Sequence, residues 1–309
     1  MGHEDFEGFA LSIIPKDLFS KKDLIYLNLR SNRLQILPDE IWGLTNLKYL
    51  NLSSNQITNV SNQIEDLVNL THLYLDTNKI EALQEEFGLL TNLQYLDIAH
   101  NPIYSLPDSI GNLTNLLFFY ISNMKLQILT PQIGNLVNLE YLNFSNNDIK
   151  AMPTSFENLA NLIEFRAYNN KLENVSEVLS GWRQIEEIYL QNNKIREINI
   201  PLEKLSKLRI LNLENNLLNS ITIEAGSSTL NSLNVRNNQL VEVPEVIGSL
   251  KSLELLDLRN NTLEILPDTI QELKNLKKLD LRWNKKLKLP SWISEFRNKG
   301  TIVYTDFEI

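Results

Sequence analysis

The chain has 309 residues, of which 43% are hydrophobic and 22% are charged, and its formal net charge is −9. This charge argues against general binding to nucleic-acid phosphates. The absence of cysteine excludes disulfide bonds, thiolate metal sites and cysteine nucleophiles. No apolar run reaches the roughly 18 residues that a membrane-spanning helix needs.

The N-terminal segment and the lack of cysteine both bear on the compartment. The first residues, MGHEDFEGF, are acidic where a signal peptide needs basic side chains, and no apolar core follows them. A chain without cysteine suits a reducing compartment. We therefore expect a cytoplasmic protein, and the alternative is a secreted protein whose signal peptide has been removed.

An internal repeat dominates the chain. The segments LIYLNLRSNRL (24–34), LKYLNLSSNQI (47–57) and LQYLDIAHNPI (93–103) share the frame L-x-x-L-x-L-x-x-N-x-L. The frames are 23 residues apart, with one step of 22 residues between Asn216 and Asn238. Their asparagines are Asn32, Asn55, Asn78, Asn101, Asn147, Asn170, Asn193, Asn216, Asn238, Asn261 and Asn284. Met124 stands at the position where the series lacks its asparagine.

A second signature separates the frames. It occurs as LPDEIWGLTNL (37–47), LPDSIGNLTNL (106–116) and LPDTIQELKNL (266–276). Its apolar residues, such as Ile41, Leu44 and Leu47, are spaced by three, which predicts a helical or 3₁₀ turn. Within each frame, inward-facing and outward-facing residues alternate, and Leu27 and Leu29 are two that face inward. This alternation predicts a short strand.

These residues resemble the leucine-rich repeat family over nearly the whole chain. The LPxxIxxLxNL variant is similar to the short class of Ras-pathway scaffolds, plant Ras-group proteins and many bacterial proteins. The resemblance implies an α/β fold: a right-handed solenoid, curved like a horseshoe, with about 12 repeats, a parallel sheet on the concave side and 3₁₀ or helical turns on the convex side. It also implies that the frame asparagines are buried and hydrogen-bond to the backbone.

Met124 should therefore carry a stability cost, because it cannot form the hydrogen bonds of an asparagine. We expect the neighbouring Asn123 to supply part of this bonding. Changing Met124 to asparagine is expected to be neutral or stabilising.

The repeat predicts one elongated domain, because a single unit of 23 residues cannot bury its leucines alone. We expect an N-terminal cap or half repeat (1–23), a solenoid of 12 repeats (24–298) and a C-terminal capping strand (299–309). Pro15 lies 23 residues before Pro38 and aligns the first cap with the repeat. In the last strand we expect Ile302 to match Leu279, after a turn at Gly300.

Two segments depart from the pattern. Residues 220–230 contain the step of 22 residues and lack the proline and the helical turn, so we expect a soft, flatter spot around Ala225–Ser228. A hinge used for docking is the alternative. Residues 271–300 carry an excess of lysine and arginine, which predicts either a solvated segment or a docking patch for an acidic partner.

Aromatic residues recur at the outward strand positions of the first repeats. In parallel strands like positions lie side by side, so the rings should form a ladder. Exposed Tyr and Phe clusters are typical of binding hot spots, although aromatics also simply stabilise strand surfaces. With Asp76, Asp97 and Arg166 as orienting charges, the predicted partner-binding residues are Tyr26, Tyr49, His72, Tyr74, Tyr95, Phe118, Tyr120, Tyr141, Arg166 and Tyr168.

A second patch is charged. Arg236, Arg259 and Arg282 occupy one outward position near Asp257 and Asp280, so they either pair across strands or form a secondary specificity patch. We also considered His72, Asp76, Asp97 and His100 as metal ligands, but their spacing matches no metal motif. We therefore expect no cofactor, no metal and no catalytic residue.

The sequence thus predicts a non-enzymatic, monomeric module that binds a protein or peptide on its concave face, with no nucleic-acid partner and no membrane insertion. The alternatives are a secreted or surface-exposed bacterial protein that binds a host protein or glycan, and an enzyme built on His72 and Asp97.

Overall fold

The computed structural model describes residues 2–224 and 229–306. The chain forms two compact units, Met1–Ile149 and Lys150–Ile309, and each is described by itself. The Ala225–Ser228 stretch, for which a soft spot is expected, lies outside the described residues. No helix in the described ranges is long and apolar enough to cross a membrane.

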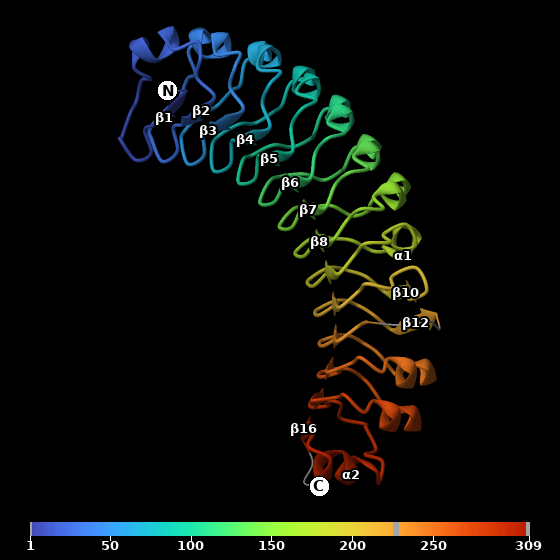
Figure 1. Ribbon diagram of the computed structural model, residues 1–309. Helices are drawn as coiled ribbons and strands as arrows, with labels where there is room; N and C mark the ends of the chain where they lie inside the picture. Colours follow the sequence, from blue (N-terminus) through green and yellow to red (C-terminus); the bar gives the residue numbers. More distant parts are fainter. Residues whose placement is uncertain (1, 225–228, 307–309) are drawn as a thin grey trace. The chain divides into compact units, whose positions relative to one another are not determined.

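The first unit is a row of parallel strands, each followed by a 3₁₀ helix. The strands lie in the order β1 (His3–Asp5), β2 (Tyr26–Asn28), β3 (Tyr49–Asn51), β4 (His72–Tyr74), β5 (Tyr95–Asp97), β6 (Phe118–Tyr120) and β7 (Tyr141–Asn143). The helices are η1 (Lys16–Ser20), η2 (Asp39–Gly43), η3 (Asn62–Asp66), η4 (Glu85–Leu89), η5 (Asp108–Asn112) and η6 (Pro131–Asn135). Within this unit the strands line the inner side of the curved ribbon and the 3₁₀ helices its outer side (Figure 1).

The second unit continues the same plan, with two differences on its turn side. Its main-sheet strands lie in the order β8 (Glu164–Arg166), β9 (Glu187–Tyr189), β11 (Ile210–Asn212), β13 (Ser232–Asn234), β14 (Leu255–Asp257), β15 (Lys278–Asp280) and β16 (Ile302–Tyr304). The helices are η7 (Thr154–Asn158), α1 (Ser176–Leu179), η8 (Glu245–Ser249), η9 (Asp268–Glu272) and α2 (Ile293–Asn298). In two repeats the extended segments β10 (Glu197–Pro201) and β12 (Ser220–Glu224) replace the helix and pair with each other.

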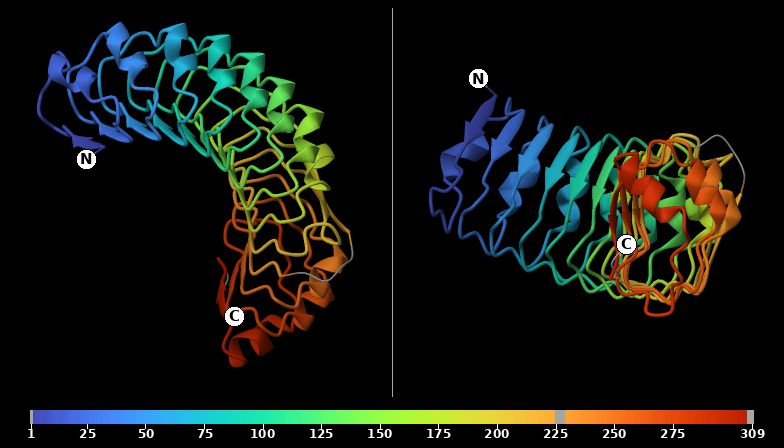
Figure 2. Two further views of the ribbon diagram at one scale, coloured as in Figure 1. Left: turned by 45° about the horizontal axis from the view of Figure 1, so that its top comes forward. Right: turned by 90° about the horizontal axis from the view of Figure 1, so that it is seen from below.

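The leucine pattern explains both kinds of element. The middle residue of each short strand points into the core, as Leu27 does, while its neighbours point to the opposite face. In η2, Pro38 stands at the N-cap and Ile41 is buried, followed by the buried Leu44 and Leu47. The predicted alternation of strands and 3₁₀ turns is confirmed, and Figure 2 shows the strands of the first unit side by side with the helices on the opposite side.

The frame asparagines form the predicted buried ladder. The Asn55 Oδ1 accepts a hydrogen bond from the Leu34 N–H at 3.0 Å, and its Nδ2 donates to the carbonyl oxygens of Leu52 and Leu29 at 3.1 and 2.9 Å. Leu29 O also accepts from Asn32, so each such carbonyl has two side-chain donors, one from its own repeat and one from the next. The ladder thus satisfies the backbone at each bend after a strand.

Met124 interrupts this ladder, and the structure shows what is lost. Ile103 is fully buried, and its N–H has no acceptor among the described residues, where Met124 replaces the asparagine that would accept. The Asn123 side chain does not compensate, because it bonds to His100 Nε2 at 3.2 Å and to the Ser122 hydroxyl at 3.4 Å. The expectation that Asn123 supplies the missing bonding is wrong: its backbone has the left-handed conformation (φ 54°), which directs its side chain away from the ladder.

Met124→Asn is expected to raise the free energy of unfolding by about 1 kcal/mol, because a buried N–H regains an acceptor while the buried methionine surface is lost. Urea denaturation of the two chains measures the difference. The exposed Lys125→Asn is a matched control and should change stability little. A marked loss of stability in Met124→Asn would show that the turn is adapted to methionine.

The two ends differ from the expectation in detail. Residues 3–5 form the unpredicted strand β1, which pairs with β2 so that His3 lies opposite Tyr26. At the other end Gly300 (φ 93°) makes the predicted turn, but Val303, not Ile302, lies opposite Leu279. The predicted register was wrong by one residue because three apolar side chains follow one another, and the least exposed one, Val303, faces the core.

Candidate binding surface

Eight of the predicted partner-binding residues lie together on one face of the first unit. The parallel register places the first residues of β2 to β7 opposite one another, and the third residues of β4 and β6 add two more rings. We call this surface the aromatic face. Its members are Tyr26, Tyr49, His72, Tyr74, Tyr95, Phe118, Tyr120 and Tyr141.

The rings pack against one another rather than standing free. Tyr26 stacks on Tyr49 with ring centroids 4.3 Å apart, and Tyr74 lies 4.7 Å from Tyr95. The row gains one ring that the sequence did not predict, because His3 on β1 stacks on Tyr26 at 4.0 Å and 3°. The rings are consequently half-buried, and they offer mainly their edges and hydroxyl groups to a partner.

Burial raises the pKa of Tyr26, Tyr74 and Tyr95 above the ordinary phenol value near 10, at which a tyrosine is already neutral at physiological pH. It is the main cause that raises the pKa of Tyr74 to about 12, with a further contribution from Tyr49. The pKa of Tyr95 is raised further still, by burial and by its hydrogen bond with Tyr120. The aromatic face therefore carries neutral hydroxyl groups at physiological pH.

Two carboxylates lie among the rings. Asp97 on β5 stands between Tyr74 and Tyr120 in the register, and one of its oxygens accepts the Ala99 N–H at 3.0 Å. Burial, and then the nearby Asp76, raise the pKa of Asp97 to about 7. Asp76 accepts hydrogen bonds from the hydroxyl groups of Ser53 and Thr77.

The histidines near these carboxylates do not complete a metal site. Within the described ranges, no three His, Cys, Asp or Glu side chains are placed to hold a metal ion. His72 Nδ1 lies 3.0 Å from the Thr71 hydroxyl, and burial lowers the pKa of His72. His100 faces Asn123 instead.

The remaining two predicted members, Arg166 and Tyr168, belong to the second unit. The Arg166 Nε lies 2.5 Å from Glu164 Oε1, and its guanidinium carbon lies 5.2 Å from the centre of the Tyr189 ring. Because Arg166 is paired within its own strand, the structure provides no support for its predicted orienting role.

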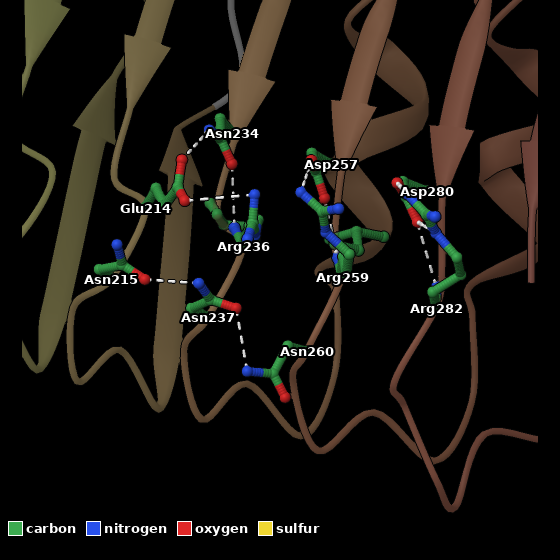
Figure 3. Close-up of polar contacts among 12 residues, drawn as sticks. Glu214, Asn215, Asn234, Arg236, Asn237, Asp257, Arg259, Asn260, Asp280 and Arg282 are labelled. Atoms are coloured by element: carbon green, nitrogen blue, oxygen red, sulfur yellow. Dashed lines mark hydrogen bonds and ion pairs between the residues drawn. The ribbon is translucent and has the colours of Figure 1, made fainter. Parts of the chain in front are cut away.

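The arginines of the second patch are also paired with acids (Figure 3). Arg282 donates to both oxygens of Asp280, two residues earlier on the chain, at 2.9 and 2.6 Å. Burial acts to raise the pKa of Asp280, but the hydrogen bonds from Arg282 outweigh it and the pKa is lowered. Arg259 lies 3.6 Å from Asp257 in the same way, and only Arg236 reaches an acid of a neighbouring repeat, Glu214 at 3.5 Å.

A second, exposed asparagine ladder runs along the second unit, and the sequence interpretation missed it. The Asn192 Nδ2 donates to the Asn169 Oδ1 at 2.6 Å, and the Asn215 Nδ2 donates to the Asn192 Oδ1 at 2.6 Å. Asn237 and Asn260 extend the series (Figure 3). The sequence feature that could have predicted this ladder is the NN doublet of these repeats. The first asparagine of each doublet has a positive φ, a conformation that asparagine tolerates.

The basic segment 271–300 lines a cavity beside the C-terminal helix. The volume of this cavity is about 580 Å³, and its lining includes Lys274, Lys277 and Lys299. Lys277 pairs with Glu254 at 2.7 Å, and Lys299 lies 4.0 Å from Glu295. The docking patch for an acidic partner stays a prediction.

Comparison with solved structures places the chain among repeat proteins. The LRR protein LIC12759 of Leptospira interrogans is 26% identical with a TM-score of 0.65, over 98% of this chain and 95% of that one. The plant peptide hormone receptor RGFR1, solved in complex with RGF2, is 26% identical with a TM-score of 0.76, over 87% of this chain. The receptor kinase GASSHO1/SCHENGEN3 of Arabidopsis thaliana, solved in complex with CASPARIAN STRIP INTEGRITY FACTOR 2, is 26% identical with a TM-score of 0.71, over 92% of this chain.

The matched region is 45% of the RGFR1 chain and 40% of the GASSHO1 chain, so this chain spans less than half of each receptor structure. No curated protein sequence matches the chain. Family models described as leucine-rich repeats match residues 10–57, 24–80, 92–113, 138–159 and 228–285, which together cover more than half of the sequence. The chain therefore belongs to the leucine-rich repeat family.

Proposed function

We propose that this chain is a non-enzymatic binding module that docks a protein or peptide on the aromatic face of its first unit. The observation that carries the proposal is the continuous row of packed rings, from His3 through Tyr26 to Tyr141, on the side of the first unit's sheet that lies opposite its 3₁₀ helices. Tyr-rich surfaces of this kind supply the anchors of protein interfaces.

The packing of the rings suits docking in energetic terms. Apolar burial stabilises a complex by about 25 cal/mol per Å², and side chains that are already ordered lose little rotamer freedom when they bind. Tyr49, for example, lies 5.2 Å from Tyr74 and 4.3 Å from Tyr26, so its ring is held before any partner arrives. The face is thus preorganised.

Two of the similar structures give independent support for a peptide or protein partner. RGFR1, a peptide hormone receptor, was solved in complex with RGF2. The receptor kinase GASSHO1 was solved in complex with CASPARIAN STRIP INTEGRITY FACTOR 2. A glycan partner fits less well, because sugars stack on open ring faces, and here Tyr26 is stacked between His3 and Tyr49. The cytoplasmic compartment remains a proposal that rests on the lack of cysteine.

Tyr95→Ala combined with Phe118→Ala tests the docking face. We expect this pair to abolish capture of the partner, identified by mass spectrometry after pull-down with the wild-type chain. Stability should fall by about 1–5 kcal/mol, because the two substitutions remove five ring pairs and cross-strand aromatic pairs each contribute about 0.2–1 kcal/mol. Circular dichroism checks that the variant is folded.

The control removes similar apolar surface elsewhere in the first unit. Ile36 and Ile128 are 79% and 77% exposed, so Ile36→Ala with Ile128→Ala should leave capture intact. Capture that survives the aromatic pair but fails in Arg259→Glu with Arg282→Glu would assign binding to the second unit and overturn the proposal.

A further inference from the structure

Asp97 is a carboxylate in the middle of the aromatic face that nothing nearby neutralises. One of its oxygens accepts the Ala99 N–H, and among the described residues no lysine or arginine forms an ion pair with Asp97 or with Asp76 on the preceding repeat. The outward Arg30, at the N-terminal end of the row, lies 3.9 Å from Glu7. The centre of the face is therefore negative.

The fold does not need this charge. Other repeats of the first unit have asparagine at the position of Asp97, and their Oδ1 atoms accept the same N–H two residues later. The distances are 3.1 Å for Asn28, 2.9 Å for Asn51 and 3.0 Å for Asn143. An asparagine would therefore do the structural work without the cost of burying a charge.

A half-buried charge that costs stability, where a neutral side chain would make the same hydrogen bond, is typical of a functional site. Burial raises the pKa of Asp97 to about 7, which expresses that cost. Docking of a partner would remove still more water from this carboxylate and increase the penalty, unless the partner supplies an opposite charge. Charge complementarity thus limits the kind of partner that fits.

We infer that the docked partner is a peptide segment that places a lysine or arginine side chain against Asp97 and Asp76, with apolar residues on either side of it contacting the rings. The inference rests on the proposed docking face and adds the chemical character of the partner that binds there. The cation would pair with the carboxylates and with hydroxyl oxygens of the neighbouring tyrosines, among them Tyr74 and Tyr95, whose tilted rings lie 4.7 Å apart between their centroids.

Selection from a phage-displayed library of random dodecapeptides on the immobilised full chain tests the inference. We expect the wild-type chain to enrich peptides with lysine or arginine at one fixed position beside apolar residues. The Asp76→Asn, Asp97→Asn variant should lose the basic position and still enrich apolar and aromatic residues. A synthetic copy of the selected peptide should bind this variant about tenfold more weakly, as expected for a lost charge-assisted bond.

The controls separate this inference from the docking face itself. Glu65→Gln with Asp66→Asn removes two charges from the exposed turn η3 and should keep the basic position. Tyr95→Ala with Phe118→Ala should lose all enrichment. If the wild-type chain enriches nothing beyond that variant, the docking face and this inference both fail; if it enriches peptides without a basic position, or if the Asp variant retains that position, the inference alone fails.

The pH dependence gives a second readout. Asp97 must be ionised to bind a cation, so the affinity for the selected peptide should rise from about pH 5.5 to about pH 8 and then level off. The groups that face Asp97 are Asp76, Tyr74 and His72 on one side, Tyr120 on the other, and Tyr95 and His100 on its own repeat. The single variant Asp97→Asn identifies the source of the effect, because a rise that persists there would belong to the histidines and contradict the inference.

Discussion

Asparagine in place of Asp97 is expected to stabilise the protein by about 1–3 kcal/mol at about pH 8. The variant keeps the hydrogen bond from the Ala99 N–H, as Asn51 does with the Ser53 N–H, and it removes a half-buried charge. Urea denaturation at several pH values measures the difference.

The sign of the pH effect follows from the raised pKa. The pKa of the Asp97 carboxyl is about 7 in the folded chain and near its ordinary value of 3.8 in the unfolded chain. Between these values the folded state holds a proton that the unfolded state has lost, so the stability of the wild-type chain falls as the pH rises. The gain of the variant should therefore be complete above about pH 7 and absent below about pH 4.

The exposed Asp66→Asn is the matched control and should show no such dependence. Equal stability of Asp97→Asn and wild type at about pH 8 would mean that the folded chain does not penalise the Asp97 charge. A stability gain combined with a loss of peptide selectivity would be the trade-off expected of a functional residue.

Asn101→Ala is expected to cost about 3–5 kcal/mol and to exceed the cost of Asn78→Ala by about 1–2 kcal/mol. The two asparagines stand at the same ladder position in adjacent repeats and make equivalent bonds. Removing Asn78 leaves the Ile57 N–H unpaired, while the carbonyl oxygens of Leu52 and Leu75 keep another donor.

Removing Asn101 has a larger effect because Met124 follows it. The Ile98 carbonyl oxygen receives its hydrogen bond from Asn101, and Met124 cannot supply the second donor that other repeats have. Both the Ile80 N–H and the Ile98 carbonyl would then be buried without a partner. Equal costs for the two variants in urea denaturation would contradict this account.

A double-mutant cycle sharpens the comparison. In the background of Met124→Asn, the new side chain should donate to the Ile98 carbonyl, so Asn101→Ala should cost no more than Asn78→Ala. The exposed Asn92→Ala removes one hydrogen bond, to Val68 O at 2.9 Å, and serves as a mild reference.

The fold was predictable because a period of 23 residues and a strict leucine pattern leave few alternatives. Local details were not predictable where several patterns compete. β1 was missed because residues 3–5 carry no leucine frame, and the register of β16 was wrong because apolar residues occupy three successive positions. Backbone geometry at Asn123, invisible in a pattern of letters, decides that it cannot replace the ladder asparagine.

The candidate site was predictable as a row of outward rings, since parallel strands align equal positions. The half-burial of the rings depends on side-chain packing, and the sequence pattern contains no measure of it. The sequence predicted Asp97 as an orienting charge, but that the fold does not need this charge became clear only once Asn28, Asn51 and Asn143 were seen to make the same bond without one. Arg166 and Tyr168 occupy the same outward positions as the aromatic residues. The sequence pattern shows neither that Arg166 pairs with Glu164 nor that both residues belong to the second unit.

The exposed ladder from Asn169 to Asn260 bears on how such a chain changes length. From Asn192 onward each member donates its amide to the asparagine of the repeat before it, so a duplicated repeat with the same NN doublet would enter the series with its hydrogen bond already available. Gain or loss of a whole repeat is then nearly neutral at this edge. Recombination between repeats can therefore vary the second unit while the aromatic face of the first unit stays unchanged.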